Sequence, residues 1–160
     1  MATALKNLSD HNNSISAAGM KIAVVVAEWN TEITEGLKKG AVETLLQQGI
    51  SENNLQVHYV PGCFELPLAA QMLLEKQNID AVICIGCVIR GETSHFDFVC
   101  QGTTYGIQSV SLKYNKPVVF CVLTDNTIDQ SRARSGGVHG NKGVEAAVTA
   151  IKMIALQKVI

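Results

Sequence analysis

A short stretch of the sequence, Arg90-Gly-Glu-Thr-Ser-His95, holds several side chains that could do chemistry together. It follows an apolar run and precedes a segment of helical character, so it would occupy the N-terminus of a helix. Backbone N–H groups and the helix dipole suit such a terminus to an anion, and Thr93 and Ser94 add hydroxyl donors. A phosphate would fit these groups, although Thr93 or Ser94 could instead simply cap the helix. Glu92 argues against a phosphate unless its carboxylate points away.

Candidate groups for proton transfer and ring binding are also present. His95 could transfer protons near neutral pH, although a single histidine is more often structural or merely exposed. Trp29, the only tryptophan in the sequence, and Phe64 could stack on a planar ring or pack in the core. Glu65 opens a predicted helix, where the dipole favours a carboxylate, and it could equally accept hydrogen bonds from ligand hydroxyls.

A glycine-rich segment near the C-terminus carries three cations. Residues 132–143 read RARSGGVHGNKG and contain Arg132, Arg134 and Lys142. The segment approaches a phosphate-binding P-loop, but glycine follows Lys142 where that pattern needs serine or threonine. A solvated basic loop is therefore as good an interpretation as a phosphate site. The chain also lacks the glycine motif of dinucleotide folds after its first strand, and it offers no metal ligands at useful spacing.

The five cysteines do not form a disulfide pattern, because their number is odd and the chain has the character of a cytosolic protein. Cys84 and Cys87 form a C-x-x-C, a spacing that also occurs in redox and metal sites. They lie within the apolar run AVICIGCVI, however, and no second pair follows. We therefore expect reduced and mostly buried cysteines that act as small apolar side chains.

The elements that position these residues alternate between strands and helices. Apolar β-branched runs predict buried strands at residues 21–27, 55–60, 80–89 and 116–123. Helical spacing predicts helices at residues 31–48, 65–77, 94–114 and 141–157, with a shorter helix at 127–134 and a loop at 135–140. Asn30 is a candidate N-cap of the first helix, and Gly49 is a candidate C-terminal stop.

This order of elements predicts an α/β fold, in which a parallel sheet carries helices on both faces through right-handed crossovers. Sheets of this kind bind ligands beyond the carboxyl ends of their strands. The polar turns at residues 28–30, 61–65 and 90–95 each follow one of the first three strands. We therefore expect these turns to meet at one edge of the sheet.

Length and composition favour one domain. The chain has 160 residues, of which 47% are hydrophobic and 17% charged, with a net charge of −1. We expect a single domain at residues 21–160, preceded by a flexible polar arm at residues 1–20. The low net charge gives no reason to expect nucleic acid or anionic membranes as partners, and no apolar run is long enough to span a membrane. Without a signal peptide the expected location is the cytoplasm, and the apolar surplus suggests an oligomer interface.

Taken together, these segments resemble lumazine synthase, the 6,7-dimethyl-8-ribityllumazine synthase family of riboflavin biosynthesis. The resemblance spans about residues 20–158 and is carried by EWN at 28–30, VPGCFELPLAA at 60–70, IGCVIRGETSHFDFVC at 85–100, PVVFCVLT at 117–124 and GNKGVEAAVTAIKMI at 140–154. It implies a flavodoxin-like three-layer α/β/α fold with a four-stranded parallel sheet.

The resemblance also implies an activity and an assembly. These transferases condense 5-amino-6-(D-ribitylamino)uracil with L-3,4-dihydroxy-2-butanone 4-phosphate, and phosphate and water leave as 6,7-dimethyl-8-ribityllumazine forms. The family uses no cofactor and no metal. Its smallest assembly is a homopentamer with active sites between neighbouring subunits, pentamers can close into an icosahedral shell of sixty subunits, and riboflavin synthase is a candidate partner. Residues 135–139 depart from the family's commoner run but contain no obvious insertion, which favours a shell.

The resemblance assigns roles on the uracil side of the site. Trp29 takes the place of the aromatic residue that stacks on the uracil ring, where the family usually has phenylalanine. The segment that holds the ribityl chain corresponds to Cys63, Phe64 and Glu65, with Glu65 accepting from the hydroxyls. The strand end that contacts the pyrimidine through backbone groups corresponds to Cys87, Val88 and Ile89.

The resemblance likewise assigns the phosphate side. Glu92 and Thr93 match the phosphate-binding turn, and His95 matches the residue that transfers protons. Many relatives have a small residue in place of Glu92, so its role would be through the backbone. A neighbouring subunit would supply the groups that complete the site, namely Phe120 over the ring, Arg134 on the phosphate, and Lys142.

Alternative interpretations come from other functional classes. One is a relative that binds flavin or lumazine without turnover, which Trp29 would favour and which His95 and Arg134 argue against. Another is a purely structural shell protein, which would have no reason to keep the polar edge. A third is a different small-molecule enzyme on a flavodoxin-like sheet, which the ordered blocks disfavour.

Overall fold

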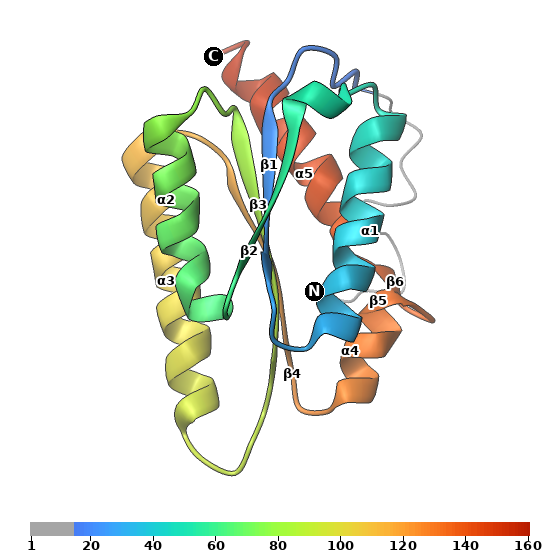
Figure 1. Ribbon diagram of the computed structural model, residues 1–160, viewed down its shortest axis with the longest axis vertical. Coiled ribbons are helices and arrows are strands. Elements are labelled where there is room, and N and C mark those ends of the chain that lie inside the picture. Colours follow the sequence, from blue (N-terminus) through green and yellow to red (C-terminus); the bar gives the residue numbers. More distant parts are fainter. Residues whose placement is uncertain (1–14) are drawn as a thin grey trace.

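Four parallel strands form a sheet in the middle of the molecule, and helices cover both of its faces in the computed structural model, which describes residues 15–160 (Figure 1). The strands are β1 (Ile22–Ala27), β2 (Leu55–Val60), β3 (Ala81–Ile89) and β4 (Val118–Asp125). Their order in the sheet is β2-β1-β3-β4, and every neighbouring pair is parallel. The predicted α/β fold with a four-stranded parallel sheet is confirmed.

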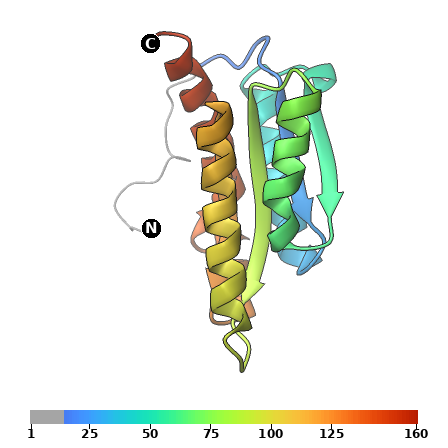
Figure 2. The ribbon, with the colours of Figure 1, turned by 90° about the vertical axis from the view of Figure 1, so that its left-hand side faces the viewer.

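Helices from different parts of the chain cover the two faces. One face carries α1 (Thr31–Gln47), α4 (Ile128–Arg134) and α5 (Lys142–Gln157). The other face carries α2 (Leu66–Lys76) and α3 (His95–Tyr114), which lie in front of the sheet in the second view (Figure 2). Two short 3-10 turns precede β2 and α2, namely η2 (Glu52–Asn54) and η3 (Cys63–Glu65).

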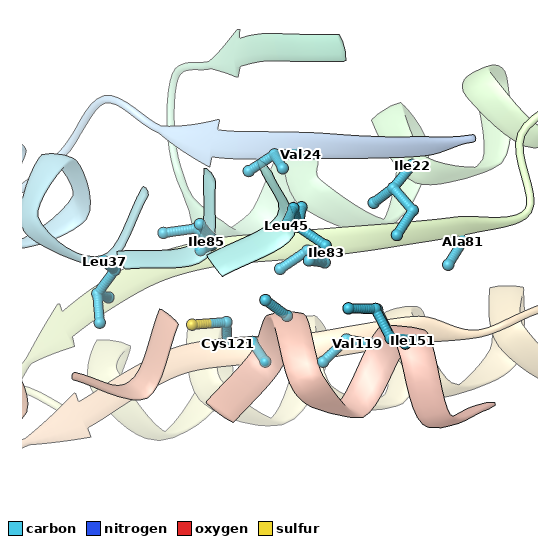
Figure 3. Close-up of a cluster of buried hydrophobic side chains, with 14 of the residues drawn as sticks. Ile22, Val24, Leu37, Leu45, Ala81, Ile83, Ile85, Val119, Cys121 and Ile151 are labelled. Atoms are coloured by element: carbon cyan, nitrogen blue, oxygen red, sulfur yellow. The ribbon is translucent and has the colours of Figure 1, made fainter. Parts of the chain in front are cut away.

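Alternating side chains of the central strands build two separate core layers. In β1, Ile22 and Val24 point towards α1 and α5, where they meet Leu37, Leu45 and Ile151 (Figure 3). The intervening β1 residues join the layer beneath α2 and α3. This alternation explains why β1 and most of β3 are continuous apolar runs, because each strand is covered on both faces.

The prediction of a buried second strand is wrong. The residues of β2 are only half-buried or exposed, and Val57 and Tyr59 are among the exposed apolar side chains. The physical reason is position, because β2 is an edge strand that pairs with β1 alone among the described strands. An apolar sequence run cannot distinguish a central strand from an edge strand whose cover comes from elsewhere.

Local boundaries also differ from the sequence-based expectations. The expected loop at 135–140 contains a small antiparallel hairpin, β5 (Ser135–Gly137) and β6 (Gly140–Asn141). The helix expected from residue 65 starts one residue later, after η3, with proline in its first turn. Gly49 follows α1 with a φ of 94°, as expected of a C-terminal stop. The arm expected at residues 1–20 lies mostly outside the described residues, and near its end Ala17 and Met20 are buried.

Candidate functional site

The turns after the strands meet at one edge of the sheet, as predicted. The backbone N–H of Glu28, after β1, donates to the carbonyl of Val60 in β2 at 2.9 Å. On the other side, the backbone N–H of Arg90 after β3 donates to the carbonyl of Asp125 in β4, also at 2.9 Å. These bonds join β1 to β2 and β3 to β4 at their carboxyl ends, which is where parallel sheets bind ligands.

Asn30 is a residue whose role the sequence only partly indicated. It occupies the N-cap position of α1, as predicted, but its side chain makes no capping hydrogen bond. The residue is in the left-handed region with a φ of 59°, and its Nδ2 donates instead to the carbonyl oxygen of Cys87 at 2.9 Å. The turn after β1 is thereby fixed to the end of β3.

Trp29 and Glu65 gather around Gly62. A Cβ atom on Gly62 would lie 3.2 Å from Oε2 of Glu65 and 3.5 Å from Cδ1 of Trp29. The indole is 72% exposed, so its faces are open to a planar ligand rather than packed in the core. The structure therefore brings these two predicted site residues together.

Cys63 and Phe64 face different surroundings. The thiol of Cys63 is buried under β3, where a Cβ on Gly86 would lie only 2.4 Å from Sγ, and burial raises the pKa of this thiol to about 12. The ring of Phe64 leans on α3, where a Cβ on Gly102 would lie 2.6 Å from Cε2. Phe64 is nevertheless exposed, so it remains available at the surface of the site.

The strand end at Cys87, Val88 and Ile89 runs from the buried core to the edge of the sheet. Sγ of Cys87 contacts Oγ of Ser131 in α4 at 3.3 Å, and burial raises the pKa of the Cys87 thiol. Cys84 points into the opposite core layer, so the C-x-x-C does not form a chelating pair. The expectation of reduced and mostly buried cysteines is confirmed, with Cys100 half-buried.

The loop between β3 and α3 projects beyond the sheet at the bottom of the ribbon (Figure 1). Glu92, Thr93 and His95 are all exposed there, and the backbone N–H of His95 approaches Oγ1 of Thr93 at 3.4 Å. The side chain of Arg90 makes other contacts. Its guanidinium pairs with Asp97 at 2.9 Å and lies 4.1 Å from the centroid of the Phe96 ring. These contacts brace the base of the loop.

Phe120, Arg134 and Lys142 line a different part of the molecule. They border a groove of about 900 Å³ that follows β4 between α3 and α5. Phe120 is 40% exposed, Nη1 of Arg134 donates to the carbonyl of Gln130 at 2.8 Å, and Lys142 pairs with Glu145 at 2.7 Å. The structure therefore groups these three residues with one another.

Within this groove, Phe120 lies far from the ring site of the same chain. Phe120 pairs with Cys84 in the sheet register and lies five residues before Asp125, the last residue of β4. At about 3.3 Å per residue, Phe120 is roughly 16 Å below the carboxyl end of its strand. Its ring does not reach the edge where Trp29 lies.

The comparisons with known proteins agree with this geometry. The family model of 6,7-dimethyl-8-ribityllumazine synthase matches residues 19–158, a range that includes every element from β1 to α5. The chain belongs to the 6,7-dimethyl-8-ribityllumazine synthase family. It is 52% identical to the family member of Porphyromonas gingivalis over 99% of this chain and 100% of that protein. The member from Cytophaga hutchinsonii is 54% identical over 97% of this chain and 98% of its own length.

Two further findings concern the described part of this lumazine synthase family member. Residues 15–160 contain no cluster of histidine, cysteine, aspartate and glutamate that could hold a metal ion. None of the helices in that range is long and apolar enough to cross a membrane.

Proposed function

We propose that this chain condenses 5-amino-6-(D-ribitylamino)uracil with L-3,4-dihydroxy-2-butanone 4-phosphate to give 6,7-dimethyl-8-ribityllumazine, with release of phosphate and water. The observation that carries the proposal is a match to the lumazine synthase family over nearly the whole chain. The exposed polar and aromatic side chains at the carboxyl edge of the sheet support it, because a purely structural protein would not need them.

The uracil substrate would bind at the edge formed by β1, η3 and β3. Trp29 supplies an exposed aromatic face for the ring, and Glu65 lies next to it to accept hydrogen bonds from ribityl hydroxyls. The half-buried backbone at Val88 and Ile89 offers peptide groups to the pyrimidine. A buried strand end suits this task because its position varies little.

The phosphate substrate would bind near the projecting loop, with Thr93 and backbone N–H groups at the start of α3 as donors. Glu92 takes part through its backbone. The amine of the uracil attacks the ketone and gives a Schiff base with loss of water. Phosphate is then eliminated, the resulting enol tautomerises to a ketone, and the ribityl-bearing amine attacks that ketone and closes the ring with loss of a second water. His95 moves protons in the dehydration and elimination steps.

Phe120, Arg134 and Lys142 would complete the site of a neighbouring subunit. The distance of roughly 16 Å between Phe120 and the carboxyl edge of its own sheet supports this role for Phe120. Arg134 would then pair with the phosphate of a substrate bound mainly to the next chain, as the guanidinium fork allows. The proposed assembly is a homopentamer that closes into a sixty-subunit shell, with riboflavin synthase as a candidate partner.

An exposed stripe on α3 supports such an assembly. Phe98, Tyr105 and Leu112 are exposed and recur at every seventh position. A strict seven-residue repeat forms a narrow seam that pairs with other helices in coiled coils.

The family relationship and the five free cysteines support a location in the reducing cytoplasm. Residues 21–160 would act as one catalytic domain.

The test is a mixing assay with both substrates, in which the lumazine product is followed by its absorbance against the uncatalysed background. The wild type should accelerate the reaction. His95→Ala should slow turnover without abolishing it, because holding two reactants in place contributes several kcal/mol independently of proton transfer. Arg134→Ala should mainly raise the KM for the phosphate substrate. His58→Ala is the matched control, since His58 lies exposed on β2.

Three outcomes would contradict the proposal or one of its parts. No acceleration by the wild type, with the uracil still bound, would make the chain a binding relative rather than an enzyme. Loss of all activity in His95→Ala with intact substrate binding would contradict the view that His95 only assists a reaction driven by proximity. An unchanged KM in Arg134→Ala would remove Arg134 from the phosphate site.

A further inference from the structure

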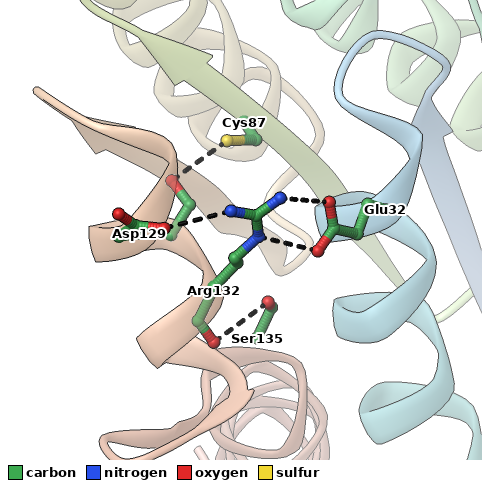
Figure 4. A network of polar contacts seen from close by, with 6 residues as sticks. Glu32, Cys87, Asp129, Arg132 and Ser135 are labelled. Carbon is green, nitrogen blue, oxygen red and sulfur yellow. Dashed lines mark hydrogen bonds and ion pairs between the residues drawn. The ribbon is translucent and has the colours of Figure 1, made fainter.

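Arg132 is the centre of an ion-pair network that joins two helices. Its Nε donates to Oε1 of Glu32 at 2.8 Å and its Nη2 donates to Oε2 of the same carboxylate at 3.0 Å, in a bidentate pair (Figure 4). Its Nη1 reaches Oδ1 of Asp129 at 3.0 Å. Glu32 lies in the first turn of α1, whereas the other two residues lie in α4. The network therefore fixes the orientation of α4 relative to α1.

The short helix α4 needs such contacts, because an isolated helix of seven residues is far below the length that is stable in water. Its N-terminus is held by a capping box between Thr127 and Gln130. Its buried side is held by Ser131, whose Oγ donates to Asp125 at 2.7 Å. Arg132 attaches α4 to α1, which neither of these contacts does.

Arg134 lies on the opposite side of α4 from Arg132. The two residues are two positions apart in the helix, which corresponds to a rotation of about 200° at 3.6 residues per turn. Arg132 is turned towards α1, and Arg134 lines the groove along β4. A rotation of α4 about its axis would therefore move both side chains at once.

The segment after α4 is attached to the same face of α1. Nδ2 of Asn141 donates to the carbonyl of Gly36 at 2.9 Å, and a Cβ on Gly40 would lie 2.6 Å from the Asn141 side chain. A Cβ on Gly36 would lie 2.7 Å from the carbonyl oxygen of Ser135. Both ends of the segment that separates Arg134 from Lys142 are thus docked on α1, and the Glu32–Arg132 pair attaches the preceding helix α4 to α1.

We propose that Arg132 is a positioning residue that, through its bidentate pair with Glu32, holds Arg134 in the orientation that binds the phosphate substrate. This inference rests on the proposed function, in which Arg134 contacts that phosphate. Arg132 itself does not touch the substrate, since its donors are directed to Glu32 and Asp129. Glu32 lies three residues after Trp29 in the sequence, so the pair links the segment that carries the ring site of one chain to the cation that the chain lends to its neighbour.

The competing interpretation is a surface ion pair that has no effect on function, because exposed ion pairs often contribute nothing measurable to stability. The three directed donors and the bidentate geometry distinguish this network from such pairs. The discriminating property is selectivity. If the ion pair has no effect on function, its removal would leave every kinetic constant unchanged. If its removal causes a general loss of structure, all of the constants would change together.

The experiment measures steady-state kinetics of the assembled enzyme with each substrate varied in turn, for the wild type, Arg132→Glu, Glu32→Arg and the double exchange. Arg132→Glu should raise the KM for the phosphate substrate about three- to tenfold, as loss of one charge-assisted contact usually does. The KM for the uracil and the sedimentation of the assembly should stay unchanged. The double exchange is made together with Asp129→Asn, because Asp129 would repel a carboxylate at position 132. It restores the opposite charges and should return the KM to within about twofold of that of Asp129→Asn alone.

Further variants keep the test decisive. Arg132→Gln removes the charge without adding repulsion, and Arg132→Lys should recover only part of the effect because a point charge cannot make the bidentate pair. Glu43→Arg is the matched control, since Glu43 is an exposed partner of Lys39 at 3.9 Å on the same helix. It should leave all constants unchanged.

The inference fails if the Arg132 variants keep the wild-type KM for the phosphate substrate. It also fails if the double exchange does not restore that KM, or if both KM values and kcat change together with the melting temperature. Arg134→Ala, measured in the same series, separates this from the proposed function. Absence of wild-type turnover refutes the function, whereas an Arg134-dependent KM without any response to Arg132 refutes only the positioning role.

Discussion

Nδ2 of Asn30 donates to the carbonyl oxygen of Cys87 at 2.9 Å and thereby bonds the turn after β1 to the end of β3. The two strands are neighbours in the sheet, but their paired register stops at Val26 and Ile85. The side-chain bond continues their connection beyond the last backbone pair. It fixes the residue that follows Trp29, and so it sets the direction in which the indole leaves the sheet.

Substitution of Asn30 should separate two contributions to stability. Asn30→Gly removes the side-chain bond, which should lower the free energy of unfolding by about 1 kcal/mol. Asn30→Ala removes the same bond and also places a Cβ in the left-handed region at a φ of 59°, which should add about 1 kcal/mol. Urea unfolding of both variants measures the difference. An alanine variant as stable as the glycine variant would contradict the strain.

Trp29 should report on ring binding by its own fluorescence, because it is the only tryptophan in the chain. Stacking of the uracil substrate on the exposed indole should quench the emission, whereas inorganic phosphate should leave it unchanged. Trp29→Ala should raise the KM for the uracil about tenfold, and Trp29→Phe by less than about threefold, since both aromatic rings can stack. Emission that is insensitive to the uracil would show that the indole does not contact the ring.

Mixed assemblies should reveal whether the site is shared between chains. Trp29→Ala would damage the ring half of a site, and Arg134→Ala would damage the half that a neighbour supplies. After the two variants are unfolded together and reassembled, some interfaces join two intact halves, so activity should exceed the mean of the separate samples. A Trp29→Ala/Arg134→Ala chain mixed with Arg134→Ala is the control and should show no gain. Absence of any gain over the mean in the first mixture would place all of these residues in one chain's site.

The fold was predictable from the sequence where signals are local. The apolar β-branched run at residues 22–27 and the helical spacing that follows it give the first strand and helix directly. The meeting of the polar turns at one edge also followed, because it depends only on the parallel order of strands. Contacts across long separations did not follow. Arg132 and Glu32 are 100 residues apart, and no pattern within either segment indicates the other.

The roles of the site residues could likewise be predicted only where they depend on local sequence. Asn30 was recognised as a residue suited to the start of a helix, but its bond to Cys87 requires knowledge of which strand lies beside β1. The exposed character of β2 likewise depends on its place at the sheet edge and not on its own residues. The grouping of Phe120 with Arg134 and Lys142 came from the family resemblance and from no local pattern, and the structure places all three along one groove.

The contact between Gly86 and Cys63 should make β3 intolerant of a methyl group. A Cβ on Gly86 would lie 2.4 Å from Sγ of Cys63, so Gly86→Ala should destabilise the fold by about 1–3 kcal/mol. Cys63→Ala removes the sulfur, and the double variant should therefore be more stable than the sum of the single effects predicts. Gly91→Ala is the control, because nothing lies within 4 Å of its added Cβ. Strict additivity of the two changes in thermal unfolding would contradict the clash.

The Glu32–Arg132 pair should make the stability of the fold depend on pH, with a loss of stability in acid. The hydrogen bonds from Arg132 lower the pKa of Glu32 below its ordinary value of 4.5. The carboxylate therefore binds its proton less readily in the folded chain than in the unfolded chain, so the pair stabilises the fold above the unfolded-state pKa. That stabilisation is lost as the pH falls through the lower, folded-state pKa. The wild type should have a higher urea midpoint than Glu32→Gln at neutral pH, and the two midpoints should converge well below pH 4.5. Glu43→Gln, whose carboxylate lies 3.9 Å from Lys39, is the matched control and should show a much smaller difference at neutral pH. A Glu32→Gln deficit that persists unchanged in acid would mean that the contact stabilises the protein by packing rather than by charge.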